Sequence, residues 1–164
     1  MSRIVSYFRR MQSNLSEVQQ TLASEVSMSG VGIHSGQTVA IRLLPAEPNT
    51  GIVFKRVDLP NAPTVKADVD NVVETNRSTT IEANGARVGT IEHLMAGLVG
   101  NGIDNVVIEI NAAEVPILDG SAEPFIELIQ QVGAKQQDAP KVYYTLQHNI
   151  VFVDEEKKVE MVAL

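Results

Sequence analysis

The chain has 164 residues, of which 44% are apolar and 20% are charged, a composition typical of globular proteins. It contains no cysteine, which excludes disulfides, thiolate metal sites and cysteine nucleophiles, so a metal would need His, Asp or Glu ligands. The formal net charge of -7 argues against a nucleic-acid-binding surface, because phosphate binding depends on clustered Lys and Arg.

The first 20 residues differ in pattern from the rest of the chain. Their arginines precede the first acidic residue, Glu17, and their apolar residues recur at near-helical spacing. We interpret residues 1–20 as an N-terminal extension, loose or helical. No window reaches the run of roughly 18 to 20 apolar residues that a membrane span needs, and no apolar signal-peptide region follows the first charges. We therefore predict a cytoplasmic protein without a membrane span.

From Thr21 to Val73 the apolar residues alternate with polar ones, as in Val39, Ile41 and Leu43. This period of two predicts half-buried, mainly antiparallel strands. Further along, Asn84-Gly85 separates two short alternating runs. That dipeptide predicts a type I′ hairpin, because both residues tolerate positive φ.

Two segments have helical periodicity. The first follows Thr90, a possible N-cap, and ends near Gly100; its apolar stripe consists of Ile91, Leu94, Met95, Leu98 and Val99. The second begins near Ser121 with Pro124 in its first turn and ends at Gly133. We therefore predict an α+β domain over residues 21–133, with the two helices packed on one sheet.

The last 31 positions follow a different pattern. Residues 134–140 are polar and end in proline, which favours a linker. Residues 141–164 predict a hairpin around residues 154–157 and end within an apolar-alternating strand. We interpret this hairpin as the start of a second domain that is cut off at Leu164.

Candidate chemistry centres on Glu92 and His93, in the first turn of the first helix. At about 100° per residue, His93 lies almost opposite the stripe centred near Leu98, with Glu92 on its flank. The alternative is that both belong to the solvated face of a surface helix. A zinc helix of the HExxH type is excluded, because position 97 is glycine.

Three other residues carry weaker signals. His34 lies among glycines, and an ordinary turn histidine explains it as well as a binding role does. His148 alternates with apolar neighbours and is interpreted as a residue on a sheet face. Asp119 precedes Gly120-Ser121 before a helix, where a turn and cap are the simplest interpretation.

Four separated blocks resemble the zinc-dependent UDP-3-O-acyl-N-acetylglucosamine deacetylases of lipid A biosynthesis, from about Thr21 to Gly133. In chain order the blocks are SGVGIHSG, LPAEPNTGIVFKRVDL, TIEHLMAGLVGNGIDNVVIEI and EVPILDGSAEPF. The resemblance implies two domains of similar α+β topology with the active site between them. This chain would be the N-terminal half.

The resemblance also implies roles for the two adjacent residues. His93 would be one of three ligands of a Zn²⁺ ion, and Glu92 would be the general base acting on the water bound to it. The other ligands, a His and an Asp from an H-K-x-x-x-D helix, would come from the second domain, as would a Thr and a His that assist the reaction. No such motif occurs in this chain.

Two functions follow as expectations. The first is hydrolysis of the N-acetyl group of UDP-3-O-(3-hydroxyacyl)-N-acetylglucosamine by the complete enzyme, with this chain inactive by itself because it lacks the second-domain residues. The alternative is a non-catalytic binding or interaction module that keeps the fold of the N-terminal domain.

Overall fold

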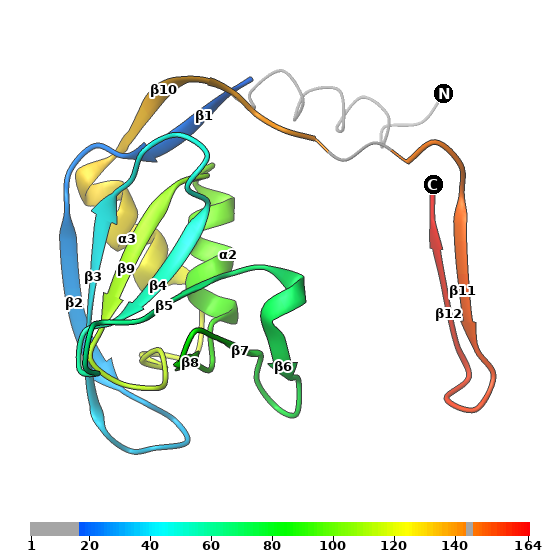
Figure 1. Cartoon of the computed structure of the whole chain (residues 1–164), viewed down its shortest axis with the longest axis horizontal. Helices are drawn as coiled ribbons and strands as arrows, with labels where there is room; N and C mark the ends of the chain where they lie inside the picture. Colours follow the sequence, from blue (N-terminus) through cyan, green and yellow to red (C-terminus); the bar gives the residue numbers. More distant parts are fainter. Residues whose placement is uncertain (1–16, 144–145) are drawn as a thin grey trace.

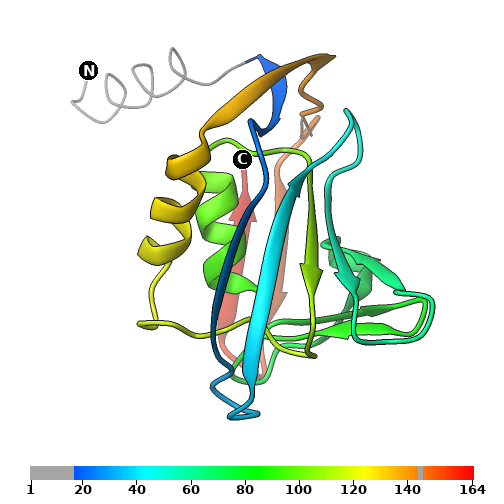
Figure 2. The ribbon, with the colours of Figure 1, turned by 90° about the vertical axis from the view of Figure 1, so that its left-hand side faces the viewer.

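The computed structural model describes residues 17–143 and 146–164. A five-stranded sheet with the order β2-β3-β9-β4-β5 forms its main layer, and the β4–β9 pair is the parallel one. The strands are β2 (Val26–Val31), β3 (Thr38–Pro45), β4 (Ile52–Arg56), β5 (Thr64–Lys66) and β9 (Val106–Ile110). Helices α2 (Glu92–Gly100) and α3 (Glu123–Val132) cover one face of this sheet (Figures 1 and 2). The α+β prediction is confirmed.

The hydrophobic core lies between this sheet and the two helices. Alternate residues of β3 and β9 face it, as the period of two requires. The fully buried core side chains include Val39, Ile41, Leu43, Ile108, Ile110, Leu94, Leu98, Phe125 and Ile129. The alternation of Val39, Ile41 and Leu43 therefore correctly predicted the buried face of β3.

The prediction that Val99 belongs to the buried stripe of α2 is wrong. Val99 is 66% exposed, whereas Gly97 is buried against Phe125 of α3. The buried face of α2 thus contains Leu94, Gly97 and Leu98. Gly97 belongs to it because a residue without a side chain lets α3 approach closely. At about 100° per residue, Val99 then points away from the core.

Both helices begin two residues later than the sequence suggested. Thr90 is not an N-cap: its φ is 57°, and the residue before α2 is Ile91, which makes no capping bond through its side chain. Helix α3 begins at Glu123, whose N–H donates to the Ser121 hydroxyl at 3.1 Å. Pro124 in its first turn and Gly133 at its end are confirmed.

A small second sheet connects β5 to α2. Its strands are β6 (Val72–Glu74), β7 (Thr80–Ala83) and β8 (Ala86–Val88), and a 3-10 turn, η1 (Val69–Asn71), precedes them. Asn84 and Gly85 have φ of 53° and 80°, so the predicted I′ hairpin is confirmed. Residues 75–79, between β6 and β7, run toward the start of α2.

The segment suggested as a linker is a strand. β10 (Ala134–Pro140) pairs antiparallel with β1 (Val18–Leu22), which begins three residues before the predicted domain start. The sequence did not predict this strand because it is polar, and the side chains that it bonds are polar as well. Gln137 accepts from the amide of buried Asn105 at 2.8 Å, and the Gln19 amide donates to the Pro140 carbonyl at 2.9 Å.

The C-terminal hairpin is present and stands apart from the sheets in Figure 1. It consists of β11 (Ile150–Asp154) and β12 (Val159–Ala163), and all of its apolar side chains are exposed. The interpretation of His148 as a residue on a sheet face is wrong, because His148 lies in a bend before β11. None of the helices within the described ranges has the length and hydropathy of a membrane span. The predicted extension lies outside these ranges up to residue 16.

Candidate active site

Glu92 and His93 are both half-buried in the first turn of α2. The Glu92 Oε1 atom accepts a short hydrogen bond from the backbone N–H of Thr79, in the loop between β6 and β7. This bond fixes one carboxylate oxygen. Oε2 accepts no hydrogen bond from any residue that the structure describes, so it is free to accept a proton.

His93 has an unpaired nitrogen. Its Nδ1 atom is buried and has no hydrogen-bond partner within the described part of the chain. A buried polar atom without a partner is rare, and it points to an ion or ligand that completes the site. Because the buried face of α2 includes Gly97, it lies closer to His93 than the predicted stripe does, and His93 is at its edge.

Asp119 lies within electrostatic range of His93. Hydrogen bonds from the Ser121 backbone N–H and hydroxyl, each 2.9 Å long, lower the pKa of the Asp119 carboxyl, and the charge of His93 contributes to the lowering. The expected turn before α3 is therefore confirmed. It also brings a carboxylate near His93.

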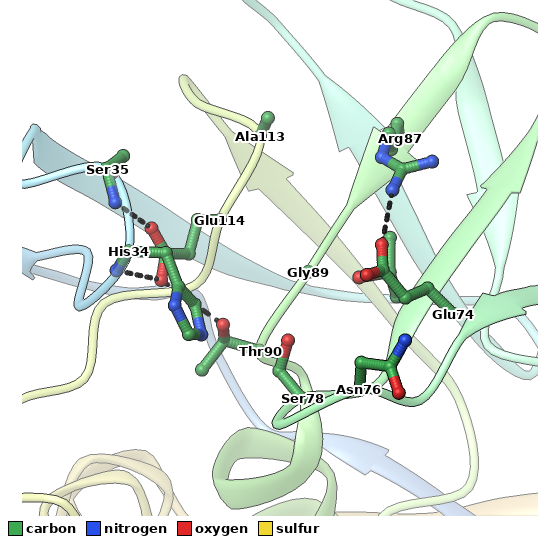
Figure 3. A pocket seen from close by; sticks show the side chains of 11 residues that line it. His34, Ser35, Glu74, Asn76, Ser78, Arg87, Gly89, Thr90, Ala113 and Glu114 are labelled. Carbon is green, nitrogen blue, oxygen red and sulfur yellow. Dashed lines mark hydrogen bonds and ion pairs between the residues drawn. The ribbon is translucent and has the colours of Figure 1, made fainter.

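A cavity of about 380 Å³, whose lining includes Thr90 just before α2, lies beside the start of this helix (Figure 3). The 75–79 loop forms one wall through Asn76 and Ser78, and Thr90 lies between the cavity and α2. His34, on the loop between β2 and β3, is exposed and lines the opposite wall. The structure thus gathers His34, Thr90 and the loop that binds Glu92 around one cavity.

Glu114 is the buried carboxylate of this cavity, with 6% of its surface exposed. Its Oε1 accepts from the backbone N–H of His34 at 2.9 Å and the Thr90 hydroxyl at 3.2 Å, and its Oε2 accepts from the Ser35 N–H at 2.9 Å. Burial alone would raise the pKa of Glu114. The hydrogen bonds from His34, Ser35 and Thr90 outweigh burial and hold the pKa below its ordinary value.

The residues present suit part of a metal site. No group of three His, Asp or Glu side chains that could hold an ion exists within residues 17–143 and 146–164. His93, with its unpaired imidazole nitrogen, fits a single zinc ligand. Any zinc site that includes His93 therefore needs further ligands from elsewhere.

Sequence reasoning singled out Glu92, His93, His34 and Asp119, and the structure places all of them at the same end of the domain. His148 is exposed in the bend before the C-terminal hairpin and takes no part. Sequence reasoning missed Glu114. The available signal was an acidic residue next to Val115 and Pro116 in an otherwise apolar run, a place where an unpaired charge would be costly.

Comparison with known proteins identifies a matching family. The model of the LpxC family, UDP-3-O-acyl N-acetylglycosamine deacetylase, matches residues 19–164. The match includes the segment after Gly133, beyond the range of the resemblance described above.

Curated relatives carry the name UDP-3-O-acyl-N-acetylglucosamine deacetylase. That of Teredinibacter turnerae is 47% identical over 140 residues, which cover 85% of this chain and 46% of that protein. Those of Geobacter sp. strain M21 and Myxococcus xanthus are 46% identical over 88% and 87% of this chain, and 47% and 46% of their own lengths. The chain spans about half the length of these relatives. With the family model covering most of its residues, the chain belongs to the LpxC family of UDP-3-O-acyl N-acetylglycosamine deacetylases.

Proposed function

We propose that this chain supplies the general base and one zinc ligand of a cytoplasmic UDP-3-O-acyl-N-acetylglucosamine deacetylase of lipid A biosynthesis. The observation that carries the proposal is the pair Glu92 and His93, in which one carboxylate is fixed by a backbone amide and one imidazole nitrogen is buried without a partner. Membership of the deacetylase family supplies the reaction, hydrolysis of an acetamide to acetate and a free amine.

Glu92 would move the proton. With Oε1 bound to the Thr79 N–H, the carboxylate cannot rotate freely, and Oε2 is presented as the acceptor of a proton from the attacking water. Such positioning is what general-base catalysis requires, since the acceptor must lie within hydrogen-bond reach of the proton it removes. The proton would then be available for the departing amine.

His93 would hold the metal together with ligands from another part of the enzyme. A Zn²⁺ ion bound by His and carboxylate ligands lowers the pKa of a bound water and polarises a carbonyl group. Because the described residues provide one suitable imidazole and no three-ligand cluster, we propose that the 164-residue chain alone neither retains zinc tightly nor deacetylates.

The C-terminal hairpin supports a division of the site between two domains. Its apolar side chains on both strands are exposed, among them Phe152, Val153 and Met161. Contiguous exposed apolar side chains are typical of surfaces that pack against another part of a protein. We propose that the hairpin packs against the rest of the second domain of the same enzyme, which would also contribute the remaining zinc ligands.

A chimera tests the assignment of the two residues. This chain would replace the matching 46% of the Teredinibacter turnerae enzyme, and zinc content and kcat would be measured for the chimera and its variants. We expect Glu92→Gln to retain zinc while kcat falls by about 10² to 10⁴, because glutamine cannot accept the proton. His93→Ala should lose both zinc and activity, because one ligand is removed.

The controls separate chemistry from folding. Glu109→Gln makes the same chemical change on β9, where Glu109 pairs with Lys55 at 3.0 Å, and should behave like the unmodified chimera. The 164-residue chain alone should contain no stoichiometric zinc. Full turnover by Glu92→Gln would show that Glu92 is not the base, and retained zinc in His93→Ala would show that His93 is not a ligand.

A further inference from the structure

The Glu114 carboxylate joins three segments that are distant in the sequence. Its own segment pairs with the residue before Thr90, through Gly89 N–H to the Ala113 carbonyl at 2.9 Å and Val115 N–H to the Gly89 carbonyl at 3.0 Å. Its side chain reaches the loop between β2 and β3 and the residue two positions before Glu92. These contacts place the carboxylate at the junction of the cavity wall and α2 (Figure 3).

The loop that bears His34 is built around this carboxylate. Two successive N–H groups, those of His34 and Ser35, point at its two oxygens. The Glu114 carboxylate also lies where a side chain at Gly32 would project, so the loop closes on it with a glycine. Without an acceptor there, these two backbone N–H groups would lose the partner that holds the loop in this conformation.

Thr90 is held in an uncommon backbone conformation. Its φ of 57° lies in the left-handed region, where a β-branched residue is strained. Its hydroxyl is buried and bonds Glu114, and this contact compensates for part of the strain. The conformation of Thr90 sets the direction in which α2 begins, and therefore where Glu92 meets the Thr79 N–H.

We propose that Glu114 is a positioning residue of the deacetylase site: through the Thr90 hydroxyl it sets the start of α2, and through two backbone amides it sets the His34 loop. The proposal rests on the proposed roles of Glu92 and His93. It goes beyond them, because it assigns their placement to a carboxylate that contacts neither residue.

Amide hydrogen exchange and NMR of the 164-residue chain test the proposal without any need for activity. Glu114→Gln keeps the size of the side chain but replaces one acceptor oxygen with a donor. We expect exchange at the Ser35 or His34 amide to accelerate at least about tenfold. We also expect accelerated exchange at the Thr79 amide, which Glu92 binds, and shifted resonances of the His93 ring.

A matched pair at Thr90 isolates the link to the helix. Thr90→Val keeps the branched shape and loses the hydroxyl, whereas Thr90→Ser keeps the hydroxyl. We expect Thr90→Val to accelerate Thr79 exchange and move the His93 ring resonances while the Ser35 amide stays protected, and Thr90→Ser to resemble the unmodified chain. Glu109→Gln is the control for loss of a carboxylate elsewhere.

The response of the Thr79 amide and the His93 ring to Thr90→Val decides the proposal. If Thr90→Val leaves the Thr79 amide and the His93 ring unchanged, Glu114 does not position the pair, and the proposal is overturned even if Glu114→Gln fails to fold. In the chimera, the proposal expects Thr90→Val to lower kcat with KM nearly unchanged. A chimera that is inactive before any substitution would contradict the proposed function, whereas the exchange results would still decide the role of Glu114.

Discussion

At the scale of single residues, carboxylates in this domain differ in what stabilises their charge. Asp58 is paired with the Arg56 guanidinium, and the hydrogen bond from Arg56 lowers its pKa. Glu114 has no cationic partner among its hydrogen-bond donors, which are two backbone amides and neutral hydroxyls. Its charge is therefore stabilised by dipoles that only the folded loop brings together.

This difference predicts how Glu114 affects stability as a function of pH. Its pKa is lower in the folded chain than its ordinary value of 4.5, so the folded state favours the ionised form. The stabilisation is complete above the unfolded-state pKa and is lost as the pH falls through the lower, folded-state pKa. We expect Glu114→Gln to lower the urea midpoint at pH 7 and to lower it much less at pH 3.

Comparison of the two proteins at both pH values removes the contribution of the other carboxyl groups, which is common to both. An equal loss at pH 7 and pH 3 would mean that the substitution acts through packing, and that the charge of Glu114 is not stabilised by the fold.

The contrast between Glu92 and Glu114 shows what a sequence can reveal. Glu92 and His93 stand out in the sequence because the segment TIEHLMAGLVGNGIDNVVIEI resembles a known family. Glu114 lies in another such block, but its importance comes from a contact with His34 across 80 positions. Periodicity describes which face of one element is buried. It contains no information about which distant loop a side chain will meet.

At the scale of elements, the contact between α2 and α3 depends on Gly97. A Cβ atom at this position would lie 3.0 Å from the Cβ of Phe125 and 3.6 Å from the backbone nitrogen of Ile126. Glycine lowers helix stability by about 1 kcal/mol relative to alanine in an exposed helix interior. Here the close approach of the second helix offsets that loss. Helical spacing predicted both helices, but it did not predict that a glycine would lie in their contact.

Two alanine substitutions in α2 separate helix propensity from packing. Gly100 has open space around its Cβ position and a negative φ, so Gly100→Ala should raise the free energy of unfolding by about 0.5 kcal/mol. Gly97→Ala should yield no increase, because Phe125 must move to admit the methyl group. Urea denaturation followed by circular dichroism measures both. A gain at position 97 equal to that at position 100 would show that the helices are not closely packed there.

At the scale of the whole molecule, the pairing of β1 with β10 joins the first and the last strand of the α+β domain. Buried Asn105 connects them to the main sheet: its side chain donates to Gln19 and Gln137 and accepts from the Gly51 N–H, each at 2.8 Å. A fully bonded polar cluster of this kind is costly to break, because each buried partner left alone must be desolvated without compensation. Residues 134–140 are polar, and this composition suggested a linker. They form a strand because their partners, Gln19 and Asn105, are polar as well, which a sequence pattern does not show.

Two shortened chains test whether β10 belongs to the folded body. A chain that ends at Tyr143 keeps β10 and the bond from the Lys141 N–H to the Glu17 carbonyl, and loses the exposed C-terminal hairpin. We expect its urea midpoint to equal that of the full chain, since no apolar side chain of the hairpin is buried. A chain that ends at Gly133 removes the partner of β1 and the Gln137 acceptor of Asn105. It should lose about 2 kcal/mol or more of unfolding free energy, because β1 would lose its paired strand and Gln19 and Asn105 would lose hydrogen-bond partners. If both shortened chains unfold at the same urea concentration, residues 134–140 act as the linker that their composition suggested, and the pairing of β1 with β10 contributes nothing to the stability of the domain.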